Sequence, residues 1–158
     1  MSTLIAYSTK HGCTEKCVNM LLDKLSDLTE TVNLKNKREI DLSKYDKVII
    51  GGSIYAGQIQ KEVKKFCHDN LETLRKKRVA LFLCCMFEGD AAKKQMEDAF
   101  PKELLIMAEA KGFFGGELIP EKMGFLERSI VRAVAKTSES TSNISEENID
   151  KFVQTVNV

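Results

Sequence analysis

The sequence predicts an α/β protein in which helices cover both faces of a parallel sheet, a three-layer doubly wound fold. Two observations support this class. Strand-type and helix-type patterns alternate along the 158 residues, and the segments 47–52 and 79–84 contain continuous apolar runs. Such runs are typical of parallel strands that are buried on both faces. Repeated β-α units with short connections then give a doubly wound sheet.

Each element follows from its local pattern. Strands are expected at about 3–8, 31–34, 47–52, 79–84 and 112–118, and helices at about 14–28, 58–75, 91–109 and 145–157. Pro101 should break or restart the helix at 91–109, because proline lacks the N–H that a helix interior needs. Ser145, followed by two glutamates, is a good helix start. The Ser- and Thr-rich stretch 137–145 is typical of an exposed linker.

Composition indicates one soluble domain that spans residues 1–158. The chain is 43% hydrophobic, and no apolar run approaches the ~20 residues that a membrane-spanning helix needs. Five cysteines, an odd number without an export signal, favour reduced thiols in the cytoplasm. With no C-x-x-C and only two histidines, we expect no metal site. The charge is nearly balanced, with 24 basic and 23 acidic residues, and we expect no nucleic-acid partner.

The most informative segment is 7–15, which closes an apolar strand and opens a helix. The first N–H groups of a helix have no partner within it, and the helix dipole adds partial positive charge there, so a phosphate fits this place. Thr9 and Thr14 can donate hydroxyl hydrogen bonds, and Thr14 can also cap the helix. Gly12 lets a ligand approach the backbone. The alternative is an ordinary βα turn with a capping threonine.

Several phosphate-binding classes are excluded by residues that the chain lacks. It has neither G-x-G-x-x-G nor G-x-x-x-x-G-K-[ST], the fingerprints of dinucleotide and triphosphate sites. A phosphatase loop needs an arginine six positions after its cysteine, where this chain has Asn19 after Cys13. A receiver domain needs an aspartate after the third strand, where this chain has Ser53. A loop for one terminal phosphate monoester remains.

Three segments together resemble the flavodoxin family. The T-x-x-G-x-T-E pattern at 9–15 resembles its FMN phosphate loop, and the segment 48–57 resembles its third strand and flavin loop. The segment 112–118 resembles the fifth strand of a flavodoxin branch that includes the quinone-dependent protoporphyrinogen oxidases. The resemblance covers nearly the whole chain and implies a five-stranded parallel sheet in the order 2-1-3-4-5, with FMN as the cofactor.

The resemblance also implies the cofactor-binding residues, which lie on three loops at the carboxyl ends of the strands. They are Ser8, Thr9, Lys10, His11, Gly12, Cys13 and Thr14; Ser53, Ile54, Tyr55, Ala56 and Gly57; and Cys85, Met86, Phe87, Gly89 and Asp90. Tyr55 can offer a face to the flavin ring, and the peptide after Ala56 a polar group to the flavin N5. Alone, Tyr55 would be taken for a surface residue of a turn. We interpret the side chains of Cys84 and Cys85 as packing groups, with only the backbone of Cys85 contacting the flavin, and expect the flavin to supply all the redox chemistry.

Two departures from the electron-carrier flavodoxins leave the function open between two classes. The balanced charge and the absence of tryptophan weaken a low-potential carrier. Residues 119–144 form an extra segment before the last helix, in which 124–136 is expected to be a helix with a basic stripe of Arg128, Arg132 and Lys136. Such a helix either contacts the inner face of the membrane or packs on the domain. The alternatives are an oxidoreductase acting on a quinone or a porphyrinogen, and a soluble carrier serving redox partner proteins.

Overall fold

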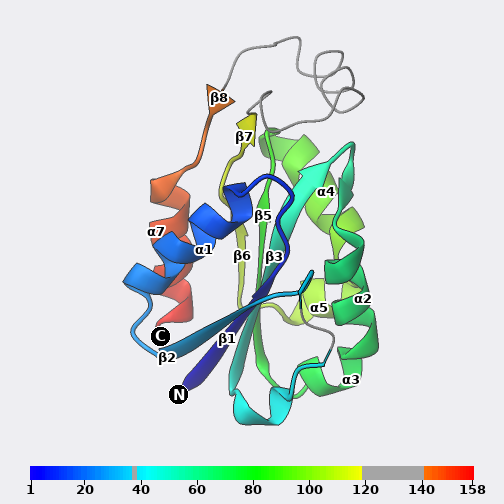
Figure 1. Cartoon of the computed structure of the whole chain (residues 1–158), viewed down its shortest axis with the longest axis vertical. Helices are drawn as coiled ribbons and strands as arrows, with labels where there is room; N and C mark the ends of the chain where they lie inside the picture. The colour runs from blue at the N-terminus through cyan, green and yellow to red at the C-terminus, as the bar shows by residue number, and fades with distance from the viewer. Residues whose placement is uncertain (37–38, 119–140) are drawn as a thin grey trace.

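The computed structural model describes residues 1–36, 39–118 and 141–158. Its centre is a row of five parallel strands in the spatial order β2-β1-β3-β5-β6 (Figure 1). Their bounds are β1 (Ser2–Tyr7), β2 (Leu28–Asn33), β3 (Lys47–Tyr55), β5 (Arg78–Cys84) and β6 (Ala110–Phe113). The short strand β4 (Gln58–Ile59) pairs antiparallel with the end of β3. Counting the parallel strands alone, the predicted order 2-1-3-4-5 is confirmed.

Helices cover both faces of this sheet, as the fold class requires. Figure 1 shows α1 and α7 on one side of it and the other helices on the opposite side. Their bounds are α1 (Cys13–Lys24), α2 (Lys61–Asp69), α3 (Leu71–Leu74), α4 (Gly89–Ala99), α5 (Lys102–Met107) and α7 (Glu146–Val156). A short 3-10 helix covers Leu42–Lys44. The protein therefore has three layers.

Two hydrophobic cores lie between the layers because successive strand residues point to opposite faces. In β3, Val48 and Ile50 pack with Val63 and Phe66 of α2. Ile49 faces the other side and packs in a core with residues of α1 and α7. The central strands are therefore apolar at almost every position, as the continuous runs in the sequence predict.

Helix boundaries differ from the prediction where strand pairing begins. The predicted helix 14–28 ends at Lys24, and Leu28 begins β2 with 77% of its surface exposed. Leu28 fits the helical period, but pairing beside Ser2 in β1 places it in the sheet. The predicted helix 58–75 begins only at Lys61, because residues 58–59 form β4. It divides at Asn70, whose side-chain amide donates to the carbonyl of Phe66 over 2.9 Å.

Other boundaries agree with local chemistry. The predicted interruption at Pro101 is confirmed, since α4 ends at Ala99 and α5 begins at Lys102. The Ser145 hydroxyl accepts a hydrogen bond from the Asn148 N–H at 3.2 Å and caps α7. The predicted strand 112–118 begins earlier, at Ala110, and is interrupted after Phe113. The phosphate loop, 8–12, connects β1 to α1 and lies at the carboxyl edge of the sheet.

The extra segment leaves and rejoins the fold through a pair of short strands. β7 (Glu117–Leu118) pairs antiparallel with β8 (Thr141–Ser142), at the edge of the molecule where the parallel strands end (Figure 1). The expected helix 124–136 and its basic stripe lie outside the described residues. None of the described helices has the length and apolar character needed to cross a membrane.

Candidate functional site: a pocket at the carboxyl edge of the sheet

The loops that follow β1, β3 and β5 enclose a cavity of about 80 Å³. Parallel strands bring their carboxyl ends to one edge, and ligands of doubly wound folds bind there. The cavity is lined by Lys10, His11, Cys13, Ser53, Ile54, Tyr55, Ala56, Cys84, Cys85, Met86, Gly116 and Glu117. Nine of these are among the predicted cofactor-binding residues, and they come from all three predicted loops.

The phosphate loop is shaped by a glycine and a threonine. Gly12 has φ 93°, in the left-handed region that side chains other than glycine rarely adopt. Its N–H donates to the Thr9 hydroxyl at 2.9 Å, and its carbonyl accepts the first helical hydrogen bond from Lys16 at 3.0 Å. The loop therefore turns sharply into α1 and presents the start of that helix to the pocket.

Thr14 is the residue that most clearly indicates a ligand. It was predicted as a helix cap, but this is wrong: Gly12 occupies the capping position, and Thr14 is the second residue of α1. Its side chain is fully buried, and within the described chain its hydroxyl has no hydrogen-bond partner. Leaving a buried hydroxyl unpaired costs about 1–3 kcal/mol. A phosphate oxygen at this helix start would supply the missing partner, so the residues present fit a phosphate monoester.

The loop after β3 is a tight two-residue hairpin. Tyr55 pairs with Gln58, and the two residues between them have positive φ, 48° at Ala56 and 78° at Gly57. Two positive φ angles are typical of the type I′ turn, whose twist matches that of the strands it joins. Glycine accepts this conformation readily, whereas alanine does so at a cost. The turn fixes Tyr55 at the mouth of the pocket.

Tyr55 is held by residues of the phosphate loop. Its hydroxyl lies 3.2 Å from the His11 Nε2, and the two ring centroids are 5.2 Å apart. The Lys10 ammonium lies 4.4 Å from the centroid of the Tyr55 ring, within the range of a cation–π contact. The phosphate loop and the hairpin therefore contact each other directly, although Tyr55 lies 44 positions after His11 in the sequence.

The third wall is the loop after β5. Cys85 and Met86 line the cavity, and the Cys85 thiol donates to the Phe87 carbonyl at 3.6 Å. Burial raises the pKa of the Cys85 thiol. Phe87, also among the predicted cofactor-binding residues, does not line the cavity and is 46% exposed.

Several predicted residues lie near the pocket without lining it. Thr9 and Gly12 belong to the phosphate loop itself and Thr14 to the first turn of α1, while the Ser8 hydroxyl donates to Glu62 at 3.1 Å. Gly57 is at the turn, and Gly89 and Asp90 begin α4. Of the lining residues, Ser53 donates its N–H to the Gln60 side chain at 3.0 Å, which anchors the hairpin.

Three lining residues, Cys84, Gly116 and Glu117, were not among the predicted ligands. Gly116 and Glu117 follow β6 and reach the cavity because the chain leaves the sheet there toward β7. The Glu117 carboxylate pairs with the Lys16 ammonium at 2.8 Å and is only 6% exposed. No local pattern marks these residues, although the end of a parallel strand is a general place to search.

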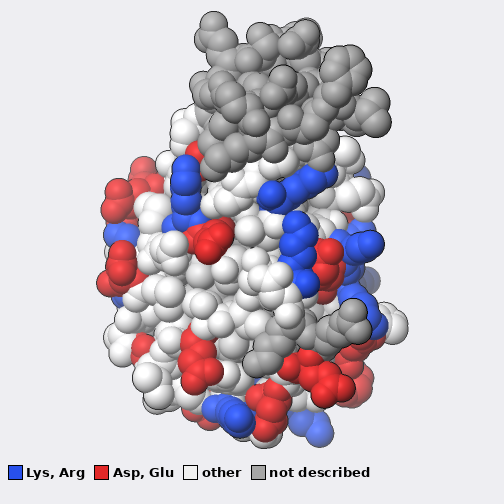
Figure 2. Space-filling model, in the orientation of Figure 1, with Lys and Arg blue, Asp and Glu red and all other residues white. Residues whose placement is uncertain are grey.

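The charges around the described part of the molecule are mixed. Figure 2 shows lysine and arginine together with aspartate and glutamate on the face viewed, so neither sign covers it alone. The formal net charge of the whole chain is +1.

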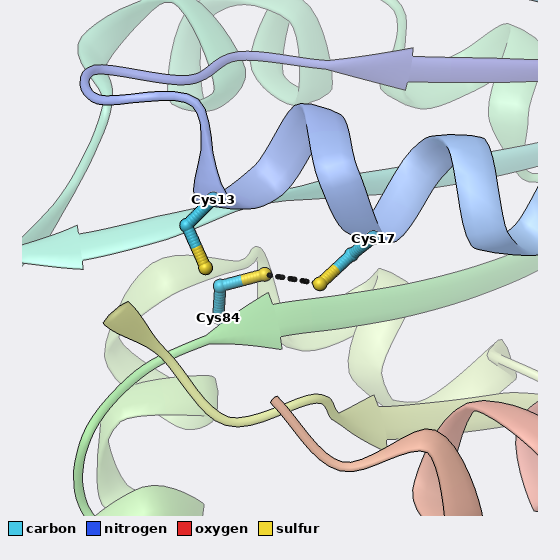
Figure 3. Close-up of side chains that lie close together, drawn as sticks. All are labelled: Cys13, Cys17 and Cys84. Carbon is cyan, nitrogen blue, oxygen red and sulfur yellow. Dashed lines mark hydrogen bonds between the residues drawn. The ribbon is translucent and has the colours of Figure 1, made fainter. Parts of the chain in front are cut away.

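A group of three thiols borders the cavity. Cys13 and Cys17 lie on successive turns of α1, and Cys84 ends β5 opposite them (Figure 3). Hydrogen bonds with Cys17 and Cys84 lower the pKa of the Cys13 thiol, whereas the contact with Cys13 raises the pKa of Cys17. These opposite shifts make Cys13, the first residue of the helix, the thiol of this pair that loses its proton more easily.

Comparison with known proteins decides the family. A family model described as the flavodoxin domain matches residues 4–145. The chain belongs to the flavodoxin domain family. It is thus a flavodoxin-like FMN-binding electron-transfer protein, in agreement with the monophosphate loop and the unpaired Thr14 hydroxyl. No curated protein sequence matches it significantly.

Solved structures share this flavodoxin fold at low sequence identity. Oxidised flavodoxin 1 from Bacillus cereus is 13% identical, with 98% of this chain and 93% of that chain covered and a TM-score of 0.56. Two-electron reduced flavodoxin from Megasphaera elsdenii is 19% identical, with 85% and 99% covered and a TM-score of 0.55. Rubredoxin oxygen:oxidoreductase from Desulfovibrio gigas is 14% identical, with 99% of this chain but 37% of that chain covered and a TM-score of 0.54. At these identities the likeness shows the fold alone.

Proposed function

We propose that this flavodoxin-like protein holds one FMN at the carboxyl edge of its sheet and carries electrons between redox partner proteins in the cytoplasm. The observation that carries the proposal is the buried, unpaired hydroxyl of Thr14 at the start of α1. A phosphate oxygen there would accept its hydrogen bond and would also meet free N–H groups of the first helical turn. A single phosphate group suits this loop, which lacks the glycines of a dinucleotide site.

The flavin ring would occupy the cavity between the hairpin and the loop after β5. Tyr55 offers an aromatic face, while Cys85 and Met86 offer backbone groups to the polar edge of the ring. The cavity of about 80 Å³ is small beside the 300–1,000 Å³ typical of enclosed ligand pockets. We therefore expect an outer edge of the ring to remain accessible to a partner. The bound flavin supplies the redox chemistry, and the protein supplies binding and orientation.

The test of this proposal is cofactor identity. Protein purified without added flavin should be yellow and should release FMN, and neither FAD nor NAD, on denaturation. Apoprotein should then recover one FMN per chain, and its flavin should exchange electrons with a flavodoxin reductase. A colourless protein that cannot be reconstituted with FMN would contradict the proposal.

A second candidate is an oxidoreductase that acts on a quinone or a porphyrinogen. It is favoured by the extra segment 119–144. This segment resembles one in the flavodoxin branch that includes the quinone-dependent protoporphyrinogen oxidases. The ends of the undescribed part, in β7 and β8, lie at the edge of the sheet that carries the pocket. Anaerobic assay of the FMN-loaded protein with protoporphyrinogen and a menaquinone analogue distinguishes the candidates, since a carrier would show no turnover without a protein partner.

Membrane contact belongs to this second candidate. Arg128, Arg132 and Lys136 would each contribute about 1 kcal/mol at an anionic surface, and salt would screen the attraction. Co-sedimentation with anionic and neutral vesicles should separate the parent from a variant with glutamine at all three positions. Equal absence of binding in both proteins at every salt concentration would favour the soluble carrier.

A further inference from the structure

Three cysteine sulfurs converge beside the cavity from two elements of the fold. Cys13 and Cys17 come from the first turns of α1, and Cys84 comes from the end of β5, 67 positions after Cys17 (Figure 3). The Sγ atoms of Cys84 and Cys17 are 3.6 Å apart, and all three sulfurs lie within 4.8 Å of one another. Cys17 and Cys84 are buried, whereas Cys13 is partly accessible.

We propose that Cys13, Cys17 and Cys84 form a three-thiolate site for one thiophilic d¹⁰ metal ion, Cu(I) or Zn²⁺. Three atoms within 4.8 Å of one another share a point no more than about 2.8 Å from each, and Zn–S bonds are about 2.3 Å long. Each sulfur would need to move by only about half an ångström. The spacing of 3.6 Å between Cys17 and Cys84 is close to the ~3.8 Å that two such bonds span at a tetrahedral angle.

The chemistry of the donors selects the class of ion. All three are sulfur, a soft ligand that favours Cu(I) and Zn²⁺ over Mg²⁺ or Ca²⁺. Among the described residues no histidine or carboxylate joins the group, so three sulfurs form the whole protein ligand set there. Trigonal coordination by three thiolates would satisfy Cu(I), while Zn²⁺ would take a fourth ligand, such as water, from the cavity. When the metal ion binds, each cysteine that is still protonated loses its thiol proton to solvent and coordinates the ion as a thiolate.

The site has an entry path and surrounding support. Cys13 and Cys84 line the cavity, so an ion can reach the group from solvent without unfolding of α1. The backbone of Glu117 lies close enough to the Cys13 thiol to help lower its pKa, and an outer contact of this kind orients a ligating atom. The sequence argued against a metal site because it contains no C-x-x-C; the third ligand is brought in by the pairing of β5 beside β3.

The remaining two cysteines provide matched controls. Cys85 is the next residue after Cys84 and is also buried, but its thiol points to the Phe87 carbonyl. Cys67 is buried in the core on the opposite face of the sheet. Neither belongs to the three-sulfur group. Alanine at either position removes a buried thiol without removing a proposed ligand.

The experiment is an anaerobic titration of the reduced full-length protein, with and without bound FMN. Cu(I) is added in competition with bathocuproine disulfonate, and Zn²⁺ in competition with a colorimetric chelator. We expect one ion per chain, with thiolate-to-metal charge-transfer absorption in the ultraviolet. Cys17→Ala and Cys84→Ala should weaken binding more than about 100-fold, since even outer-shell changes cost 10–100-fold. Cys85→Ala and Cys67→Ala should bind as the parent does.

Circular dichroism of each variant separates loss of a ligand from loss of the fold. A parent that binds neither ion would overturn the proposal, as would equal affinity in the folded Cys84→Ala variant. A disulfide between Cys17 and Cys84 in protein purified anaerobically and alkylated at once would also overturn it. Because the flavin ring would occupy the cavity through which the ion enters, these outcomes are judged on the protein without FMN, and FMN binding is measured separately. Failure of the metal site and failure of the flavin site are therefore distinguishable.

Discussion

At the scale of single residues, the side-chain hydroxyl of Thr14 is the feature that most directly indicates phosphate binding. The Thr14 hydroxyl is buried at the start of a helix and has no hydrogen-bond partner among the described residues. An unpaired buried hydroxyl lowers the stability of the protein without cofactor, and under the proposed function the phosphate of FMN would give it a partner. Removing this hydroxyl should therefore raise the unfolding free energy of the protein without cofactor and weaken its affinity for FMN.

Replacing Thr14 with valine tests this directly. The variant without cofactor should be more stable by about 1–2 kcal/mol, because the unpaired hydroxyl is gone. FMN binding should weaken by about 1–3 kcal/mol, because a hydrogen bond to a charged phosphate is lost. Urea unfolding measures the first quantity, and fluorescence titration of FMN the second.

Thr3 offers a matched control for that experiment. It is equally buried, but its hydroxyl donates to Asp27 at 3.0 Å, far from the pocket. Thr3→Val should destabilise the protein by about 1 kcal/mol and leave FMN affinity unchanged. If the two valine variants behave alike in both measurements, Thr14 has no role in phosphate binding.

At Tyr55, two substitutions distinguish the contribution of the aromatic ring from that of the hydroxyl. Tyr55→Ala removes the ring proposed to face the flavin, and should alter both the visible flavin spectrum and the redox potentials of bound FMN. Tyr55→Phe keeps the ring and removes only the hydroxyl that lies beside His11, so it should change the spectrum much less. Spectra and a redox titration of the alanine variant that both match the parent would leave Tyr55 as a residue of the turn alone.

At the scale of elements, turns with positive φ shape the rim of the pocket. Gly115, between β6 and β7, has φ 80°, and a Cβ atom on it would lie 1.7 Å from the backbone oxygen of Asn143. The segment after β6 and the segment before α7 therefore pass in direct backbone contact. Gly89, at the start of α4, also has positive φ, 60°, but a Cβ there would meet nothing within 4 Å.

Alanine variants of Gly89 and Gly115 distinguish the energetic cost of steric overlap from that of backbone strain, because both positions have positive φ but only Gly115 has a backbone atom close by. Gly89→Ala should cost about 1–2 kcal/mol of unfolding free energy, the price of a left-handed conformation for a residue with a side chain. Gly115→Ala should cost at least about 3 kcal/mol, because a backbone atom cannot move aside as a side chain can. Urea unfolding of both variants measures the difference. Equal losses of unfolding free energy in the two variants would show that the backbone around Asn143 moves aside without a measurable energetic cost.

At the scale of the whole molecule, one ion pair joins three distant segments. The Lys47 ammonium, 1% exposed at the start of β3, lies 3.0 Å from the Asp27 carboxylate and also donates to the Val156 carbonyl near the end of α7. The Asp27 side chain is 19% exposed. The hydrogen bond from Lys47 holds the pKa of Asp27 below its usual value.

This pair should make the fold sensitive to acid. Because the folded pKa of Asp27 is depressed, its contribution to stability is present above the unfolded value of about 3.9 and is lost as the pH falls through the folded pKa. Asp27→Asn should therefore flatten the decline of unfolding free energy below about pH 4. At neutral pH it should cost about 2–3 kcal/mol, somewhat less than for a fully buried pair.

An exposed ion pair provides the comparison for Asp27. Asp98 pairs with Lys94 one turn away on α4, and both side chains are more than half exposed. Asp98→Asn should cost no more than about 0.5 kcal/mol at neutral pH. Unfolding curves for both variants from pH 2 to pH 7 make the comparison. A loss for Asp27→Asn as small as that for Asp98→Asn would mean that Lys47 does not depend on this carboxylate.

Local patterns predicted most elements of this fold but not all of their ends. The apolar runs of β3 and β5, the interruption at Pro101 and the cap at Ser145 are consequences of neighbouring residues, and the structure agrees with them. Leu28 fits a helical period equally well, and only pairing beside β1 places it in a strand. Nine residues of the cavity wall are among those that the resemblance to flavodoxins implied, and they lie on loops whose positions at strand ends can be recognised from the sequence.

By itself the sequence determined the doubly wound class, the order of loops at the functional edge and the suitability of one loop for a single phosphate. These depend on hydrophobic periodicity and on residue types within a few positions of one another. Only the tertiary structure decided that the Thr14 hydroxyl lacks a partner, that Glu117 reaches the pocket and that Cys84 meets the two cysteines of α1. Each of these depends on contacts between segments far apart in the chain, which strand register and helix packing set and local residue patterns do not encode.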